Sequence, residues 1–454
     1  MISSISPTDG RPLAEYEETS PADVQTHIET ASSLQRSWEQ TTIAERAVPM
    51  LRMAELLEAH RDELARMMTE EMGKPIIQSE AEVDKCAWVC RHYAESTERI
   101  LQPDHIAADR AKSYVAYRPL GVVLAVMPWN FPLWQVYRFL APALMAGNGG
   151  LLKHASNVTG SALWIDRLTV EAGFPDGLFR TLVLPSARVD EVLEHPAVVA
   201  VTLTGSDPAG RAVAGKAGSL LKKTVLELGG SDPYVVLADA DLKKAAETCS
   251  TSRLLNGGQS CIAAKRFIVE DPVVSEFTEL LAAGLGSAVM GDPMDRATTL
   301  GPLARVDLRD ELHDQVERSV ESGARLVMGG EIPDGPGAWY PATLLADVEK
   351  GMAVYHEETF GPVASVIAAK DVDDAVRIAN DTEFGLGAAV FTTDLEKGEA
   401  IARDRIQAGA CFVNAFVASD PRLPFGGTKM SGYGRELSDM GMKEFLNAKT
   451  VVVA

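Results

Sequence analysis

Hydrophobic and polar positions first follow a helical period. From about residue 21 to 98, apolar side chains recur three and four positions apart, which predicts amphipathic helices. The run EMGKP at 71–75 contains glycine and proline and breaks this pattern, and a further helix is expected from about 77 to 101. Residues 113–118 alternate like an exposed strand.

After residue 120 the pattern of apolar and polar positions changes to short apolar runs, which are separated by helical stretches such as 133–145 and 159–172. Continuous apolar runs are typical of strands buried on both faces, and their alternation with helices predicts parallel βαβ units. One series of runs covers 121–128, 151–153, 181–185, 197–205 and 222–230; a second covers 234–241, 266–270, 324–330, 363–369, 388–392 and 409–414. No linker separates them near Gly229-Gly230, so we expect an α/β protein whose doubly wound domains meet at a cleft.

The last eight residues, 447–454, also form a strand-like run. A lone terminal strand needs a partner sheet, and we expect this one to contribute to an oligomer interface.

Charge narrows the function classes. The formal charge is −21, with 43 basic and 64 acidic residues, so nucleic acid and anionic membranes are not expected partners. No apolar run reaches the roughly 18 residues of a membrane helix. No secretion signal is expected, because the first residues have neither a basic region nor an apolar one. The five cysteines are too sparse for a disulfide framework, which indicates a reducing compartment such as the cytoplasm. We expect Cys86 and Cys90 to be apolar residues on one face of a helix rather than metal ligands. No metal site is expected.

The run NGGQSCIAAKR at 256–266 is the main candidate for chemistry. Gly257 and Gly258 allow positive φ and close approach of the backbone to a ligand, and the small neighbours leave the Cys261 thiol open. Free cysteines are usually small buried hydrophobes, and that alternative applies here too.

Two other polar residues follow apolar runs. Glu227 ends TVLEL, where burial would raise the pKa of its carboxyl toward a value suited to a general base. Asn130, in PWNFP, offers an amide donor suited to an oxyanion at the end of a strand. The alternatives are a partnered structural glutamate and a turn asparagine.

In this order, the three segments resemble the aldehyde dehydrogenase family. LKHAS (152–156), TGSDPAG (204–210), HEETFGPV (356–363), NDTEFGLGA (380–388) and PFGGTKMSGYGRE (424–436) extend the resemblance over nearly the whole chain. It implies a Rossmann-like cofactor domain at 1–228 with an oligomerisation segment at about 103–120, a catalytic domain at 229–425 and an oligomerisation tail at 426–454. It also implies a homodimer or homotetramer.

The resemblance assigns the chemistry residue by residue. Cys261 matches the nucleophile that forms a thiohemiacetal and then a thioester. Asn130 and the Cys261 N–H match the oxyanion hole, and Glu227 matches the base that activates Cys261 or water.

The implied cofactor is NAD(P). Gly205 and Gly210 match the family's phosphate turn, where a helix begins and Ser206 adds a hydroxyl. Lys153 matches the residue that reaches the adenosine ribose, although a solvated strand-end lysine is the alternative. Glu358 matches the carboxylate on the nicotinamide ribose. The remaining cofactor-binding candidates are Met127, Pro128, Trp129, Ala155, Ser156, Thr204, Leu228 and Phe360.

Ser156 favours NADP over NAD, with NAD still usable. A glutamate at this position would repel the 2′-phosphate, whereas serine removes that penalty and Lys153 can pair with the phosphate.

Within the family, the resemblance is strongest to enzymes that oxidise succinic semialdehyde, and it implies this aldehyde as the substrate. Arg138 is a candidate clamp for its distal carboxylate, with a salt bridge to an acidic neighbour as the alternative. Ser260 and Ser419 are candidate hydroxyl donors. Trp134 and Phe416 are candidate apolar walls, or core residues.

Two departures stand out. Gly149-Gly150 replaces larger residues before the 151–153 strand, which weakens its β-propensity. Ala263, Ala264 and Lys265 follow the nucleophile without a second cysteine, so no redox disulfide is expected there.

Other functions remain open. One alternative is an NAD(P)-dependent dehydrogenase of another small aliphatic or aromatic aldehyde. A CoA-acylating enzyme is disfavoured by Glu227, and a non-catalytic binding protein is disfavoured by the intact Cys261, Glu227 and Asn130.

Overall fold

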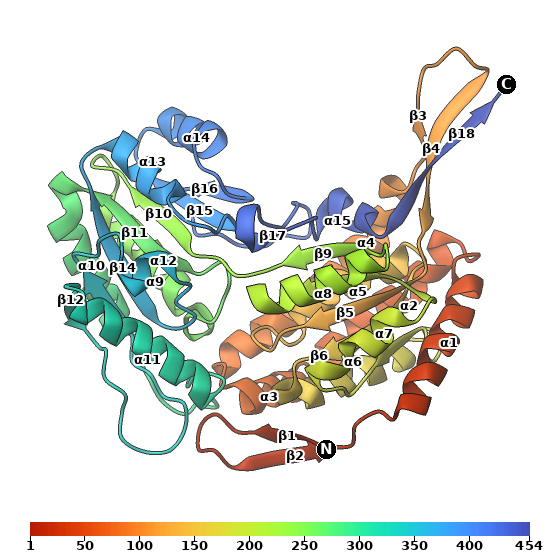
Figure 1. The fold of residues 1–454 in the computed structure, drawn as a ribbon, viewed down its shortest axis with the longest axis horizontal. Coiled ribbons are helices and arrows are strands. Elements are labelled where there is room, and N and C mark those ends of the chain that lie inside the picture. Colours follow the sequence, from red (N-terminus) through yellow and green to blue (C-terminus); the bar gives the residue numbers. More distant parts are fainter.

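Two α/β bodies and a projecting arm of strands make up the computed structural model, which describes residues 1–454 (Figure 1). One body is built on a six-stranded sheet and the other on a seven-stranded sheet. This arrangement confirms the α/β class and most of the two successive series of strands, although β12 and β16 are not buried.

The six-stranded sheet has the order β17-β9-β8-β5-β6-β7, and β17 is its only antiparallel strand. Its strands are β5 (Val122–Met127), β6 (Gly149–His154), β7 (Phe179–Thr181), β8 (Val198–Thr204), β9 (Lys223–Glu227) and β17 (Gly432–Tyr433). The strand expected over 181–185 is wrong beyond Thr181. Leu182 and Leu184 are buried because they pack into the core beside the sheet, not because they extend β7.

Helices cover both faces of this sheet. Helices α2 (Ile43–Ala59), α3 (Arg61–Met72), α4 (Ile76–Ile100), α5 (Trp134–Met145) and α6 (Thr159–Glu171) contribute to the core on one face; α1 (Pro21–Trp38), α7 (Val189–Glu194) and α8 (Asp207–Ser219) contribute to the other. Gly73, with φ of 78°, ends α3 at the predicted break. No helix of the protein has both the length and the apolar character required to span a bilayer.

The seven-stranded sheet has the order β12-β13-β14-β11-β10-β15-β16, with only β12 and β13 antiparallel. Its strands are β10 (Asp232–Val236), β11 (Ala264–Glu270), β12 (Arg325–Met328), β13 (Thr343–Ala346), β14 (Val363–Ala369), β15 (Gly387–Phe391) and β16 (Ala410–Val413). Helices α9 (Leu242–Leu254) and α10 (Val274–Gly286) pack on one face, and α11 (Val306–Glu321), α12 (Ala353–His356), α13 (Val372–Asn380) and α14 (Leu395–Asp404) on the other. The sequence did not predict β13, a run of four residues.

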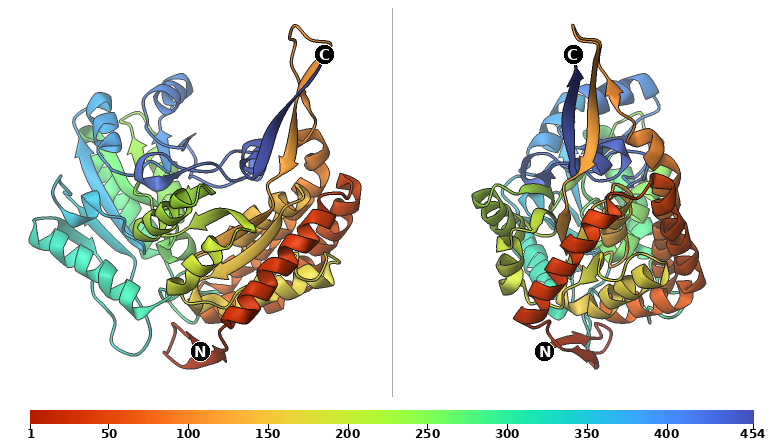
Figure 2. Two further views of the ribbon diagram at one scale, coloured as in Figure 1. Left: turned by 45° about the vertical axis from the view of Figure 1, so that its right-hand side comes forward. Right: turned by 90° about the vertical axis from the view of Figure 1, so that its right-hand side faces the viewer.

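The arm is an antiparallel sheet of β3 (Asp104–His105), β4 (Lys112–Pro119) and β18 (Leu446–Val453). It extends away from both bodies in all views (Figures 1 and 2). The terminal strand therefore has a partner within its own chain. The rest of the expected tail belongs to the first body, because β17 joins the six-stranded sheet and α15 (Ser438–Glu444) packs on α5. A hairpin of β1 (Ile2–Ile5) and β2 (Pro12–Tyr16) completes the chain.

Gly149 and Gly150 do not interrupt the sheet. They begin β6, paired with Val122 and Val123 of β5. A Cβ on Gly150 would lie 2.7 Å from Cδ2 of the buried Phe179 ring, so the absence of a side chain makes room for the aromatic ring.

We predict that Gly150→Val lowers the thermal unfolding midpoint, because overpacking a filled core costs about 1–3 kcal/mol. Gly215→Ala is the matched control. This exposed glycine of α8 has no neighbour within 4 Å of an added Cβ, and the change should stabilise the helix by about 0.5–1 kcal/mol. A Gly150→Val protein as stable as the unchanged chain would contradict the packing argument.

Candidate active site

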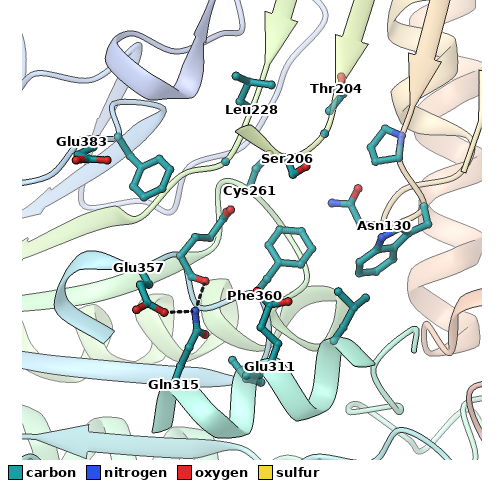
Figure 3. Close-up of a pocket in the computed structure, with 18 of the residues that line it drawn as sticks. Asn130, Thr204, Ser206, Leu228, Cys261, Glu311, Gln315, Glu357, Phe360 and Glu383 are labelled. Atoms are coloured by element: carbon teal, nitrogen blue, oxygen red, sulfur yellow. Dashed lines mark hydrogen bonds between the residues drawn. The ribbon is translucent and has the colours of Figure 1, made fainter. Parts of the chain in front are cut away.

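A cleft of about 510 Å³ lies between the two bodies (Figure 3). It is bounded by the carboxyl ends of β5, β8 and β9 and by segments that precede β11, β14 and β15. Of the predicted residues, it brings together Pro128, Trp129, Asn130, Thr204, Gly205, Ser206, Leu228, Cys261, Glu358 and Phe360. The rings of Trp129 and Phe360 meet edge to face across it, with centroids 5.7 Å apart.

A second, largely apolar cavity of about 310 Å³ adjoins the first. Cys261 and Gln135 line both cavities. The thiol is therefore the point at which a molecule in one cavity can react with a molecule in the other.

The turn that precedes Cys261 requires unusual backbone angles. Asn256, Gly257 and Gly258 have φ values of 55°, 60° and 75°. A Cβ on Gly258 would lie 2.2 Å from the carbonyl oxygen of Gly361, so only glycine fits where the turn passes the segment before β14.

Lys265 holds this loop from inside the protein. Its Nζ donates to the carbonyl oxygens of Cys261 at 2.8 Å and Ser260 at 3.0 Å, and lies 3.5 Å from Oε1 of Glu358. Lys265 therefore connects the nucleophile loop with the carboxylate on the cofactor side. No sequence pattern indicates this role, because Lys265 is simply a residue of the buried strand β11.

Asn130 is oriented by its neighbours. Its Nδ2 donates to the carbonyl oxygen of Gln259 at 3.1 Å, and its Oδ1 accepts from Nε2 of Gln135 at 3.0 Å. The second Nδ2 hydrogen has no protein acceptor among these bonds and is available to an oxyanion at the cleft. Gln135 is a positioning residue that the sequence reading missed.

Glu227 lies at the end of β9, and its two carboxylate oxygens are buried without hydrogen-bond partners. Burial, followed by the nearby charge of Glu436, raises the pKa of Glu227 well above its usual range. A buried, unpartnered carboxyl favours the neutral form until a proton acceptor or a new charge reaches it.

The same burial acts on the nucleophile. It raises the pKa of the Cys261 thiol to about 12, and the charges of Arg138 and Lys265 oppose this shift. The resting group at neutral pH is thus a thiol, which needs a base to react.

Arg138 lies in the wall of the second cavity but is ion paired with buried Glu436. It also donates to Thr204 Oγ1 at 3.1 Å, and its guanidinium lies 4.7 Å from the Phe425 ring centroid. The salt bridge that the sequence left open as an alternative is therefore present.

A buried ion pair supports the helix that carries Gln135 and Arg138. Glu82 of α4 is paired with Lys74, and its Oε1 accepts the N–H groups of Leu133 at 2.8 Å and Trp134 at 2.9 Å. These are unpaired donors at the start of α5, so Glu82 satisfies the helix terminus and fixes its position.

The cofactor candidates divide into two groups. Thr204, Gly205 and Ser206 lead into α8, whose N-cap Ser206 makes no side-chain capping bond, which leaves N–H groups of the first turn for a phosphate. Gly210 faces Leu228, where an added Cβ would lie 2.6 Å from Cδ2. Met127, Lys153, Ala155, Ser156 and Gly210 do not line the cleft itself.

Lys153 and Ser156 nevertheless lie at the same edge of the sheet. Lys153 pairs with Val126 near the end of β5, and Ser156 follows two residues after the end of β6. Lys153 Nζ donates to Ser186 Oγ at 3.2 Å, and burial lowers the pKa of Lys153. Ser156 is exposed.

The substrate candidates gather around the second cavity: Trp134, Arg138, Ser260, Phe416 and Ser419 all line it. Lys85 of α4, which the sequence reading did not consider, lines it as well.

Comparisons with known proteins agree with this architecture. A model of the aldehyde dehydrogenase family matches residues 1–451. The chain is 49% identical over 454 residues to a succinate-semialdehyde dehydrogenase [NADP(+)] from Mycobacterium avium, covering 99% of this chain and 96% of that protein. It is 46% identical to a succinate semialdehyde dehydrogenase [NAD(P)+] from Escherichia coli, covering 99% and 97%.

The fold is also similar to a solved structure of succinic semialdehyde dehydrogenase from Streptococcus pyogenes in complex with NADP+. The TM-score is 0.98 at 37% identity, and all of both chains is covered.

We predict that alkylation of Cys261 by iodoacetamide, without cofactor, accelerates about tenfold per pH unit between pH 7 and 9, because the reactive thiolate grows as pH rises toward a pKa of about 12. Mass spectrometry of the Cys261 peptide separates this reaction from that of the half-buried Cys411. A plateau of the rate near pH 8 would show a thiol with a much lower pKa.

Proposed function

This chain belongs to the aldehyde dehydrogenase family, and we propose that it oxidises succinic semialdehyde to succinate with NADP. The observation that carries the proposal is the position of Cys261 between a cofactor-sized cleft and a second cavity lined by cations and hydroxyls. The relatives at 46% and 49% identity that bear this substrate in their names support it.

In the first step Glu227, after losing its own proton to solvent, accepts the thiol proton, and the Cys261 sulfur adds to the aldehyde carbon. The carbonyl oxygen becomes an oxyanion beside the free Nδ2 hydrogen of Asn130 and the N–H of Cys261. Gln135 keeps the Asn130 amide in the orientation that presents this hydrogen.

Bound NADP supplies the two-electron oxidant for this adduct. The acyl group is then a thioester on Cys261. Glu227 releases the thiol proton to solvent and then removes a proton from the water that attacks the thioester. Overall, the aldehyde, NADP+ and water give the carboxylate, NADPH and two protons.

The residues of the cleft fit a dinucleotide. The open N-terminus of α8 suits its phosphates, and Glu358, which accepts from the N–H of Gly230 at 3.0 Å, lies where a ribose hydroxyl can reach it. Gln315 fixes this segment by donating to Glu357 Oε2 at 3.0 Å and to the Glu358 carbonyl at 3.2 Å (Figure 3).

We assign the NADP preference to Lys153 and exposed Ser156. Lys153 has no carboxylate partner, and Ser156 adds no negative charge at the edge of the sheet where the adenosine ribose would lie. NAD remains a slower alternative.

We further propose that the chain acts as a homodimer or homotetramer through its arm. Val452 and Val453 of β18 are exposed at 55% and 49%, and a projecting sheet with exposed apolar side chains favours a covering partner. The cofactor domain, the catalytic domain and the arm remain our functional division of the chain.

The substrate proposal predicts that kcat/KM with NADP is at least about tenfold higher for succinic semialdehyde than for butyraldehyde, which lacks the distal carboxylate. Cys261→Ala, assayed by NADPH absorbance, should abolish the reaction with both. Equal values for the two aldehydes, or a preference for aromatic ones, would replace succinic semialdehyde by another substrate, and undiminished NADPH production by Cys261→Ala would overturn the mechanism.

The cofactor proposal predicts that Ser156→Glu lowers the ratio of kcat/KM for NADP to that for NAD by about tenfold or more, because the new carboxylate repels the 2′-phosphate. Ser156→Gln has similar size without the charge and should change the ratio much less. An unchanged ratio in Ser156→Glu would remove Ser156 from cofactor selection.

A further inference from the structure

Three charged residues line the second cavity: Glu82, Lys85 and Arg138. Two of them already have buried partners of opposite charge, because Glu82 is paired with Lys74 and Arg138 with Glu436. Lys85 forms no ion pair, and its one hydrogen bond goes to a neutral hydroxyl, Ser419 Oγ, at 2.8 Å. The uncompensated charge in the wall of this cavity is therefore that of Lys85.

The surroundings of Lys85 hold its ammonium in place without neutralising it. Its Nζ lies 4.3 Å from the centroid of the Trp134 ring, which supports the half-buried side chain. An ammonium has three N–H donors, so others remain after the bond to Ser419. Ser419 accepts that bond and keeps its own O–H free to donate.

We propose that Lys85 binds the distal carboxylate of the substrate, with Ser419 as a second donor, and that Lys85 rather than Arg138 determines the preference for carboxylated aldehydes. This inference rests on the proposed oxidation of succinic semialdehyde. Lys85 and Cys261 line the same cavity, so one small molecule can contact both.

Arg138 is poorly suited to that role. To bind a substrate carboxylate with the same donors, its guanidinium must give up Glu436, which is buried next to the unpartnered Glu227. Leaving a buried carboxylate without its partner is strongly unfavourable. Lys85 loses no such partner.

The charge balance around Lys85 points the same way. Burial lowers the pKa of Lys85 to about 8, and Arg138 adds to this shift, whereas Glu82, Cys86 and Asp420 oppose it. A cation with so little compensation is stabilised when a carboxylate arrives.

The test compares Lys85→Met with Lys85→Arg in the full-length enzyme. Methionine keeps an apolar stem against Trp134 but has no charge. We expect Lys85→Met to raise KM for succinic semialdehyde about 10- to 100-fold, the loss of one charge-assisted hydrogen bond, with a much smaller effect on kcat. Lys85→Arg should recover most of the affinity, because it restores the charge.

Butyraldehyde separates binding of the carboxylate from a structural role. It has four carbons but no carboxylate, so its kcat/KM should fall far less in Lys85→Met. Lys244→Met, at a lysine of α9 with 81% side-chain exposure, controls for the substitution itself. Arg138→Met should instead impair both aldehydes, because it leaves Glu436 unpaired.

Three results would overturn the proposal. They are an equal loss with both aldehydes in Lys85→Met, an unchanged KM for succinic semialdehyde in that variant, or a selective loss of succinic semialdehyde in Arg138→Met. If the unchanged enzyme prefers succinic semialdehyde and Lys85→Met keeps this preference, only the role of Lys85 fails. If the unchanged enzyme has no such preference, the proposed substrate fails and the role of Lys85 with it.

Discussion

Burial of the Cys261 loop between the two sheets is the constraint on which the rest of the site depends. A buried loop exposes backbone carbonyls to a medium without water, so each needs a donor. Lys265 satisfies those of Ser260 and Cys261, and Asn130 satisfies that of Gln259. Asn130 belongs to the first body and Lys265 to the second, so these bonds join the loop to both sides of the cleft.

The same burial controls protons. It raises the pKa of Cys261 and of Glu227, so the nucleophile rests as a thiol and the base rests as an uncharged carboxyl. A protonated thiol is far less prone to oxidation than a thiolate, since oxidation follows thiolate character. The positive charge of Arg138 lowers the pKa of both groups and limits the cost of ionising them, which explains why a buried arginine is useful here without touching a substrate.

The sequence predicted most of the fold because its strands are buried on both faces and read as apolar runs, as in β5 and β8. Glu227 and Asn130 became candidates because they follow such runs, and Cys261 because it lies in a glycine-bordered loop; the resemblance to the family then implied their roles. The sequence missed β13 and β17, which are too short to show a period, and Lys85, Gln135 and Lys265. The importance of Lys85 depends on Ser419, 334 positions away, and no local pattern contains such a pair.

Specificity for an anionic substrate depends on uncompensated charge rather than on the number of cations near a cavity. Arg138 is the cation that the sequence analysis selected, but it is ion paired with Glu436 and its guanidinium lies over the Phe425 ring. Glu82 is paired in the same way with Lys74. Of the charged groups that line the cavity, only the Lys85 ammonium is left without a partner of opposite charge, and the Ser419 hydroxyl lies beside it. A carboxylate gains a charged partner there, whereas an uncharged aldehyde does not.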